Sequence, residues 1–206
     1  MIVHVYERAQ EATLLDEVII AIDSEETAKA LEPFHIKTVM TSPDHQSGTD
    51  RVSEVIQDMD VNIVVNIQGD EPGMDFRLID QMIQKFKEKN IFMVTAASTD
   101  LSLKDELDPN TVKVLLDHNN IALAFRREPR PYEMGGYYRH IGIYAFRKQA
   151  LLTFSKLPQT TNEKEQKLEQ LRALDHGLPI HVMITDYRGR SIDTEDDLKI
   201  FLEKNG

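Results

Sequence analysis

The sequence of 206 residues contains no cysteine and no tryptophan. Without thiols it can form neither a disulfide nor a thiolate metal site, and this composition fits a reducing compartment, so we expect a cytoplasmic protein. No apolar run approaches the roughly 20 residues that span a bilayer, so no membrane is expected as a partner. The N-terminal stretch Met-Ile-Val-His-Val-Tyr also lacks the charged start and long apolar region of a signal peptide.

Basic residues are scarce. The chain has 24 Lys and Arg residues against 35 Asp and Glu residues, which gives a formal net charge of −11. Such a balance argues against a general nucleic-acid or anionic-membrane surface. An anion can then be held only by a local cluster of basic side chains and backbone N–H donors.

Apolar runs of strand length alternate along the chain with segments of helical periodicity. This alternation predicts one α/β domain over residues 1–206, with an open, three-layer, mostly parallel sheet and helices on both faces. We expect strands at 18–22, 37–41, 62–68, 93–98, 112–117, 121–125, 140–146 and 180–186. We expect helices at 2–12, 23–31, from 50 onward, and at 75–89, 148–155, 162–176 and 194–203.

Three of the expected strands, between residues 112 and 146, follow one another without a helix. We interpret this segment as a small antiparallel excursion from the main sheet. Pro129, Pro131, Gly135 and Gly136 predict a projecting loop within it.

Ligands of open α/β sheets bind outside the carboxyl ends of the strands, which selects the loops 23–25, 41–49, 68–75 and 186–194. Asp70 follows one expected strand and Asp193 follows the last one. Two such carboxylates at one sheet edge suit Mg²⁺, which is typically held by one or two carboxylates together with substrate phosphates. The alternative is structural: Asp193 before Thr194, and Glu71 before Pro72, also suit plain helix starts.

Two further stretches could face a ligand. Ser47-Gly48-Thr49 opens a helix and could bind a phosphate or a base, although Ser and Thr are also ordinary N-caps. His140 and Tyr144 share one face of a strand, which could receive a ligand or hold a hydrogen-bonded core histidine. Glu169 and Arg172, three residues apart in an expected helix, could be only a surface pair.

Five stretches, in this order, resemble the signatures of the 3-deoxy-manno-octulosonate (Kdo) cytidylyltransferases: residues 44–51, 65–72, 139–144, 168–172 and 193–198. The resemblance runs from Met1 to the C-terminal end. It implies a nucleotide-diphospho-sugar transferase-like fold and an enzyme of lipopolysaccharide biosynthesis. The implied reaction transfers CMP from CTP to Kdo and releases pyrophosphate.

The resemblance also implies roles for individual residues. Asp70 and Asp193 would be the catalytic carboxylates that hold Mg²⁺. The nucleotide side maps to Ser47, Gly48, Thr49 and Arg51. The sugar side maps to Gln68, Arg127, His140, Tyr144, Glu169 and Gln170. A homodimer, formed partly through the excursion at about 112–146, is implied as well.

Members of this family begin with a strand and a basic loop that wraps the CTP phosphates, whereas the printed sequence starts at the helix that follows them. Three interpretations stay open. The sequence can be a piece of a longer cytidylyltransferase, or a truncated, non-catalytic protein that binds a nucleotide or a dimer partner. The unusual residues Arg126 and 128–130 also permit a cytidylyltransferase for another sugar acid.

Overall fold

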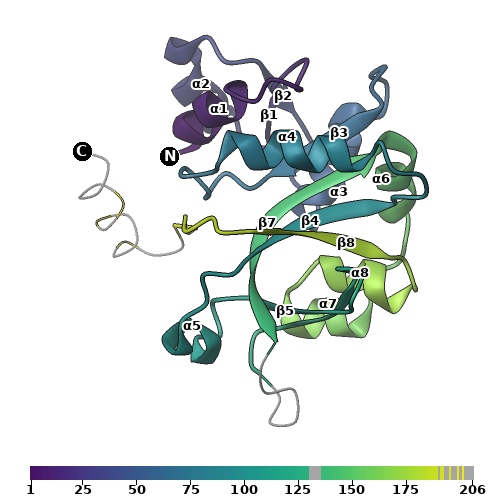
Figure 1. Ribbon diagram of the computed structural model, residues 1–206. Coiled ribbons are helices and arrows are strands. Elements are labelled where there is room, and N and C mark those ends of the chain that lie inside the picture. Colours follow the sequence, from purple (N-terminus) through teal and green to yellow (C-terminus); the bar gives the residue numbers. More distant parts are fainter. Residues whose placement is uncertain (130–135, 190, 193–194, 196–198, 200, 202–206) are drawn as a thin grey trace.

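A computed structural model describes residues 1–129, 136–189, 191–192, 195, 199 and 201. The chain forms three layers (Figure 1), with helices on both faces of a central sheet, as the alternation of the sequence predicts. The helices are α1 Ile2–Gln10, α2 Glu25–Leu31, α3 Gly48–Ile56, α4 Phe76–Lys85, α5 Leu103–Leu107, α6 Lys148–Phe154, α7 Thr161–Gln166 and α8 Gln170–Asp175, with a 3-10 turn, η1, at Glu32–Phe34. The strands are β1 Ile20–Ile22, β2 Thr38–Met40, β3 Ile63–Ile67, β4 Met93–Ser98, β5 Lys113–Leu116, β6 Ala122–Arg126, β7 Tyr137–Arg147 and β8 Ile180–Thr185.

Among the described residues the central sheet has six strands, and β7 lies in its interior, between β3 and β4. Strands β3, β4, β5 and β8 run in one direction, and β6 and β7 run against them. The sheet is therefore mostly parallel in strand direction. The pairings that β7 makes are nevertheless antiparallel, because it separates strands of the other direction.

The interpretation of 140–146 as part of an excursion outside the main sheet is wrong. Residues 137–139 of β7 pair with β5, and residues 143–147 pair with β3. Burial alternates along the first half of the strand and becomes continuous from Ile143 to Phe146. This change is expected of a strand that begins beside the β5–β6 hairpin and continues into the part of the sheet that is covered on both faces. Within the described residues, β5 and β6 correspond to the expected excursion, as an antiparallel hairpin at one end of the six-stranded sheet.

Apolar side chains on the two faces of the sheet form two core clusters. Val94, Ile143 and Ala145 pack toward α1 and α4, whereas Met93 and Phe146 pack toward α3, α6 and α8. Burying a large apolar side chain stabilises the fold by about 1.5–3 kcal/mol, so the two clusters together hold the three layers. Strands β1 and β2 form a separate parallel pair, which packs on α1 and α2 through Ile20, Ile22 and Leu31.

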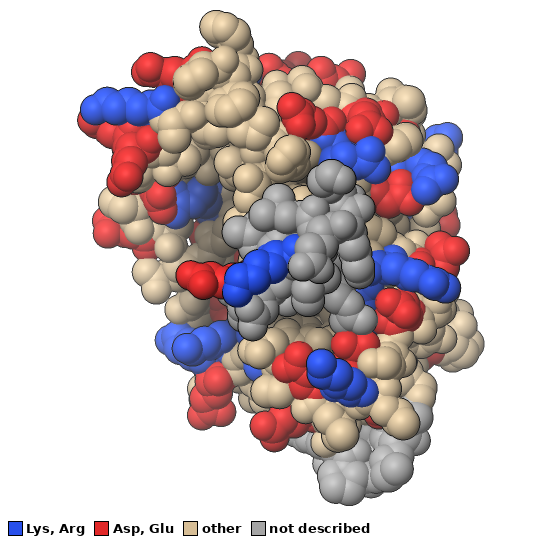
Figure 2. Space-filling view, turned by 90° about the vertical axis from the view of Figure 1, so that its left-hand side faces the viewer, with Lys and Arg blue, Asp and Glu red and all other residues tan. Residues whose placement is uncertain are grey.

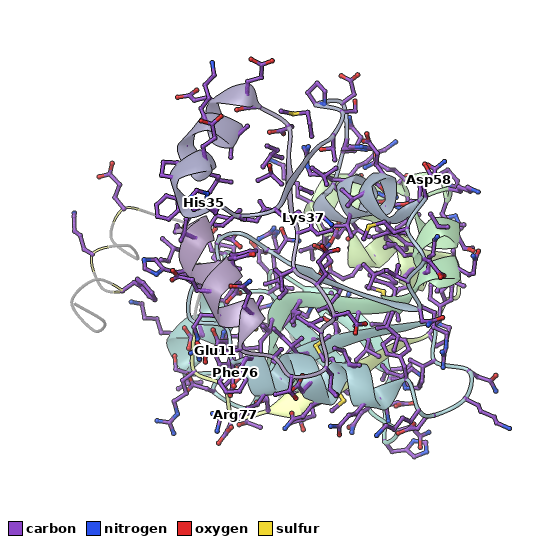
Figure 3. All side chains as sticks on the ribbon, turned by 90° about the horizontal axis from the view of Figure 1, so that it is seen from above. Glu11, His35, Lys37, Asp58, Phe76 and Arg77 are labelled. Carbon is purple, nitrogen blue, oxygen red and sulfur yellow. The ribbon has the colours of Figure 1, made fainter. Side chains whose placement is uncertain are left out.

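Helix α1 is fixed at the edge of the sheet by contacts with α4 and the segment before it. The Arg8 guanidinium lies 5.4 Å from the centre of the Phe76 ring and donates a 3.3 Å hydrogen bond to the Met74 carbonyl. Arg8 also pairs with Glu11, and Figure 3 shows Glu11 and Phe76 next to each other at the meeting of the two helices. These contacts place the start of α1 beside Gly69, where a Cβ would come 3.1 Å from the Ile2 side chain.

Several helices differ from their predicted bounds. The single helix expected at 162–176 is two helices, because Lys167 adopts a left-handed conformation (φ 53°) that ends α7. Helix α5 was not predicted, and its capping box between Ser102 and Asp105 is the local signal for it. The helix expected at 194–203 lies largely outside the described residues.

The described part of the chain contains no helix that is long and apolar enough to cross a membrane. On the side of the molecule drawn in Figure 2, Lys and Arg side chains lie interspersed with Asp and Glu side chains. A continuous basic surface, which nucleic-acid binding requires, is not seen among the coloured residues of that side.

Candidate active site

A cavity of about 1030 Å³ opens at the carboxyl end of β3 and extends along β7 to the junction of α7 and α8. This is the edge of the sheet at which the sequence predicts a ligand site. Nine of the predicted site residues line it: Ser47, Gly48, Gln68, Asp70, Arg127, His140, Tyr144, Glu169 and Gln170.

The segment after β8 meets the end of β3 at this cavity. The backbone N–H of Ile192 donates a 2.8 Å hydrogen bond to the carbonyl of Asp70, and Ser191 lines the cavity. The Tyr187 carbonyl accepts hydrogen bonds from Ser98 (2.6 Å) and Arg139 (2.9 Å), which fix the path of this segment. Asp193 itself lies outside the described residues, so its approach to Asp70 stays a prediction.

Ser47 caps α3, since its hydroxyl accepts a 3.1 Å hydrogen bond from the Asp50 N–H. The plain N-cap reading is therefore correct, and Ser47 and Gly48 line the cavity as well. A Cβ on Gly48 would come 3.2 Å from Nε2 of Gln68, closer than side chains normally pack. The absence of a side chain at position 48 therefore leaves room for the amide of Gln68.

Thr49 and Arg51 do not line the cavity. Buried Thr49 donates a 2.8 Å hydrogen bond to Oε1 of Glu169 and accepts one of 3.0 Å from Asn66. Arg51 pairs with Asp23 at 2.7 Å and donates to Thr41 at 2.6 Å, so it joins the loops that follow β1 and β2. Its predicted contact with a nucleotide stays a prediction.

His140, Gly142 and Tyr144 all line the cavity, as their common position on one strand face predicts. The His140 ring packs edge-on against Phe125, with centroids 5.0 Å apart, and burial together with the charge of Arg139 lowers its pKa to about 3. The Tyr144 hydroxyl donates a 3.1 Å hydrogen bond to Oε1 of Gln170, and burial raises its pKa well above the usual value.

Glu169 begins the α8 side of the cavity. Burial raises the pKa of its carboxyl, an effect that hydrogen bonds from Thr49 and Ser47 oppose and the charge of Asp50 reinforces. The carboxylate therefore bonds to the same turn, residues 47–49, that opens α3.

Arg127 is held by three backbone carbonyls. Its guanidinium donates to Gln166 (2.8 Å), Pro109 (3.1 Å) and Lys167 (3.3 Å). A guanidinium carries five N–H donors, so two remain beyond these contacts. Arg127 thus fastens the junction of α7 and α8 to the loop before β5, and it still borders the cavity.

Arg172 is not part of a surface pair with Glu169. It is 1% exposed, and its guanidinium pairs with Asp50 at 2.9 Å and with Glu163 at 2.6 Å. Burial alone would lower the pKa of Arg172, but the hydrogen bonds to Glu163 and Asp50 outweigh it and raise the pKa. The spacing of Glu169 and Arg172 gave no sign of this, because Asp50 lies 122 residues away.

The cavity also contains polar residues that the sequence reading did not assign. Lys164 and Lys167 add positive charge on the α7 side, and Asn110 and Gln159 add amide groups. The sequence carries no signal for Lys167, because its left-handed backbone at the end of α7 is seen only in the structure. No group of three or more metal-ligand side chains occurs among the described residues. A site built from two aspartates would include Asp193, beyond that range.

Comparison with known proteins identifies the family of this chain. Residues 1–182 match the family model described as cytidylyltransferase. The 3-deoxy-manno-octulosonate cytidylyltransferase of Geobacter sulfurreducens is 39% identical over 220 aligned positions, which cover 99% of this chain and 88% of that protein. The corresponding protein of Solibacter usitatus is 40% identical, with 97% of this chain and 81% of that protein covered.

Solved structures agree. A CMP:2-keto-3-deoxy-manno-octonic acid synthetase complexed with CTP has a TM-score of 0.89 and 33% identity, covering 100% of this chain and 88% of that one. The 4-diphosphocytidyl-2C-methyl-D-erythritol synthase of Anaerococcus prevotii, at 15% identity and a TM-score of 0.61, covers 98% of this chain and 89% of that one and shows the fold alone. The chain therefore belongs to the cytidylyltransferases and is a nucleotidyltransferase enzyme.

Proposed function

We propose that this protein transfers CMP from CTP to Kdo and releases pyrophosphate, a reaction of lipopolysaccharide biosynthesis. One observation carries the proposal: a single cavity brings together the turn at Ser47-Gly48, Asp70, and all six residues assigned to the sugar side. The relatives that align with nearly the whole of this chain are named for this reaction.

In this reaction the anomeric hydroxyl oxygen of Kdo forms a bond to the α-phosphorus of CTP. The bond from that phosphorus to the oxygen that bridges the α- and β-phosphates breaks, and pyrophosphate leaves. The attacking hydroxyl group of Kdo gives up its proton. Negative charge must be neutralised on the departing pyrophosphate, which is usually the largest demand on such a site.

Asp70 with Asp193 would hold Mg²⁺, and carboxylate oxygens are the donors that this ion prefers. The fit rests on Asp70 at the cavity wall and on the hydrogen bond from Ile192, the neighbour of Asp193, to the Asp70 carbonyl. When bound, Mg²⁺ supplies positive charge beside the triphosphate.

The chain's own residues orient the two substrates. Ser47 and Gly48 present the start of α3 toward the nucleotide, while Gln68 sits between that turn and β7. The polar surface of Tyr144, Glu169 and Gln170 faces the sugar. Arg127, with two N–H donors beyond its backbone contacts, and Lys167 would attract the sugar-acid carboxylate.

The test is pyrophosphate release from CTP with Mg²⁺ and a panel of sugar acids. We expect release that depends on Kdo and falls at least tenfold with N-acetylneuraminic acid. A preference for another acid would replace Kdo as the substrate. No release with any acid, together with CTP binding by calorimetry, would favour a non-catalytic nucleotide-binding protein.

We also propose a cytoplasmic homodimer. The family resemblance implies the dimer and places its contact at about 112–146, a segment in which Leu123 of β6 is 58% exposed. Sedimentation at micromolar concentration tests the dimer, and a monomer alone would contradict it.

A further inference from the structure

Thr95 lies in the middle of β4, fully buried, and its hydroxyl touches His140. Oγ1 of Thr95 is 2.8 Å from the carbonyl oxygen of Ile143 and 2.9 Å from Nε2 of His140. The carbonyl oxygen of Ile141 is also within reach of Oγ1, at 3.4 Å. Carbonyl oxygens can only accept, so the single hydroxyl proton of Thr95 is donated to a carbonyl, and the shorter contact is that to Ile143. Oγ1 must then accept from His140, and the proton of the His140 ring therefore lies on Nε2.

The sheet is irregular at this point, which explains why a threonine is there. The register between β4 and β7 shifts between Thr95 and Ala96, so Thr95 is opposite Tyr144 while Ala96 is opposite Ile141. Such a bulge interrupts the ladder of backbone hydrogen bonds. The Thr95 hydroxyl donates to the Ile143 carbonyl there. Gly142, which the register shift leaves without a partner on β4, lines the cavity.

The surroundings of the His140 ring keep it neutral. Phe125 packs edge-on against it, Tyr144 lies 5.7 Å away between ring centres, and Arg139 of the same strand adds a positive charge. The carboxyl group of Glu169, the residue before α8, acts on Tyr144 in this cluster. Within the described part of the chain, Nδ1 of His140 has no hydrogen-bond partner, and the ring lines the cavity.

We propose that Thr95 is a positioning residue, which fixes His140 in the Nε2–H form so that Nδ1 accepts a hydrogen bond from a hydroxyl group of the sugar substrate. The hydrogen bond to a sugar hydroxyl rests on the function proposed above. The lone pair of a neutral Nδ1 repels a carboxylate, so His140 binds a hydroxyl group of the sugar. The carboxylate of the sugar acid binds to the cations of the cavity. His140 therefore selects for a hydroxyl and not for the charge of the substrate.

The proton position can be measured without any substrate. In ¹⁵N-labelled protein, two-bond ¹H–¹⁵N correlation spectra distinguish protonated from bare ring nitrogens, and the His140 signals are assigned by their loss in His140→Gln. We expect a protonated Nε2 and a bare Nδ1, unchanged between pH 8 and pH 5.5. A proton on Nδ1, or a doubly protonated ring in this range, would overturn the proposal.

The variants Thr95→Val and Thr95→Ser separate positioning from packing. Valine keeps the shape but offers no acceptor, so we expect a mixture of tautomers and a KM for Kdo raised about tenfold, the loss of one hydrogen bond. KM for CTP should change less than twofold. Serine keeps the hydroxyl and should restore both the tautomer and KM for Kdo to within about threefold of the wild type.

Outcomes that contradict the proposal are distinct from a failure of the proposed function. A Thr95→Val protein with a lowered melting temperature, the wild-type tautomer and an unchanged KM for Kdo would show that Thr95 only packs. A wild-type protein that turns over no sugar acid would contradict both the proposed function and the hydrogen bond from His140 to a sugar hydroxyl. The spectra would still decide whether Thr95 sets the proton on His140.

Discussion

The hydroxyl of Thr49 donates a 2.8 Å hydrogen bond to Oε1 of Glu169, a residue 120 positions further along the chain. Thr49 belongs to the turn that opens α3, and Glu169 lines the cavity among the residues proposed to bind the sugar. The bond therefore joins the turn proposed for the nucleotide directly to the proposed sugar side. The ion pair of half-buried Asp50 with buried Arg172, one residue after Thr49 and three after Glu169, fixes the same junction.

Gly48→Ala should separate stability from activity. Position 48 is the first residue of α3 and has an ordinary backbone conformation. Alanine is more favourable than glycine by about 0.5–1 kcal/mol within a helix, and at its first residue we expect at most this gain. Its Cβ would displace the Gln68 amide, which lies 3.2 Å away. We expect an unchanged or higher melting temperature and a kcat/KM lowered about tenfold.

The control for Gly48→Ala is the same change in a Gln68→Ala background, where no amide remains to be displaced. There the substitution should alter kcat/KM less than twofold. An equal loss in both backgrounds would show that the added methyl group acts on something other than Gln68.

Arg172→Met should strongly destabilise the fold. It leaves Asp50 and Glu163 partly buried without their cation, and breaking such a pair typically costs about 3–5 kcal/mol. Lys37→Ala, which removes the exposed pair with Glu17, should cost less than about 1 kcal/mol. Urea unfolding of both proteins measures the difference, and equal costs would contradict the role given to Arg172.

The lowered pKa of His140 predicts how the free energy of unfolding changes with pH. Its pKa in the folded protein is about 3, below the value of about 6.5 expected for an unfolded histidine. Between these values the unfolded state binds more protons, so this contribution to stability is complete above pH 6.5 and is lost as the pH falls toward 3. His140→Gln should weaken that dependence, as measured by urea unfolding between pH 7 and pH 4.5. An unchanged slope would show that His140 titrates normally.

The strands were predictable because their apolar runs are local properties of the sequence, and β3, β4 and β8 lie where those runs place them. The position of β7 was not predictable from its composition, since one strand of 11 residues pairs with β5 at one end and lies in the sheet interior at the other. The break at Lys167 was missed because a left-handed lysine has no sequence signature like that of glycine.

The residues of the site also divide into those with a local sequence signal and those without one. Residues at strand ends and on one strand face, such as Asp70 and His140, could be selected by position alone. The partners of Arg172, Arg127 and Thr95 could not, because each bond joins residues that only the folded chain brings together. Long-range polar contacts leave no periodicity in a single sequence.

The most direct measurement is Kdo-dependent pyrophosphate release from CTP by the wild-type protein and by Asp70→Asn, at saturating Mg²⁺. Asparagine keeps the size of the side chain but removes its charge, so the melting temperature should stay within a few degrees. Turnover should fall by about two orders of magnitude, as on removal of one electrostatic stabiliser. Near-normal turnover by Asp70→Asn would contradict the assignment of Asp70 as a catalytic carboxylate.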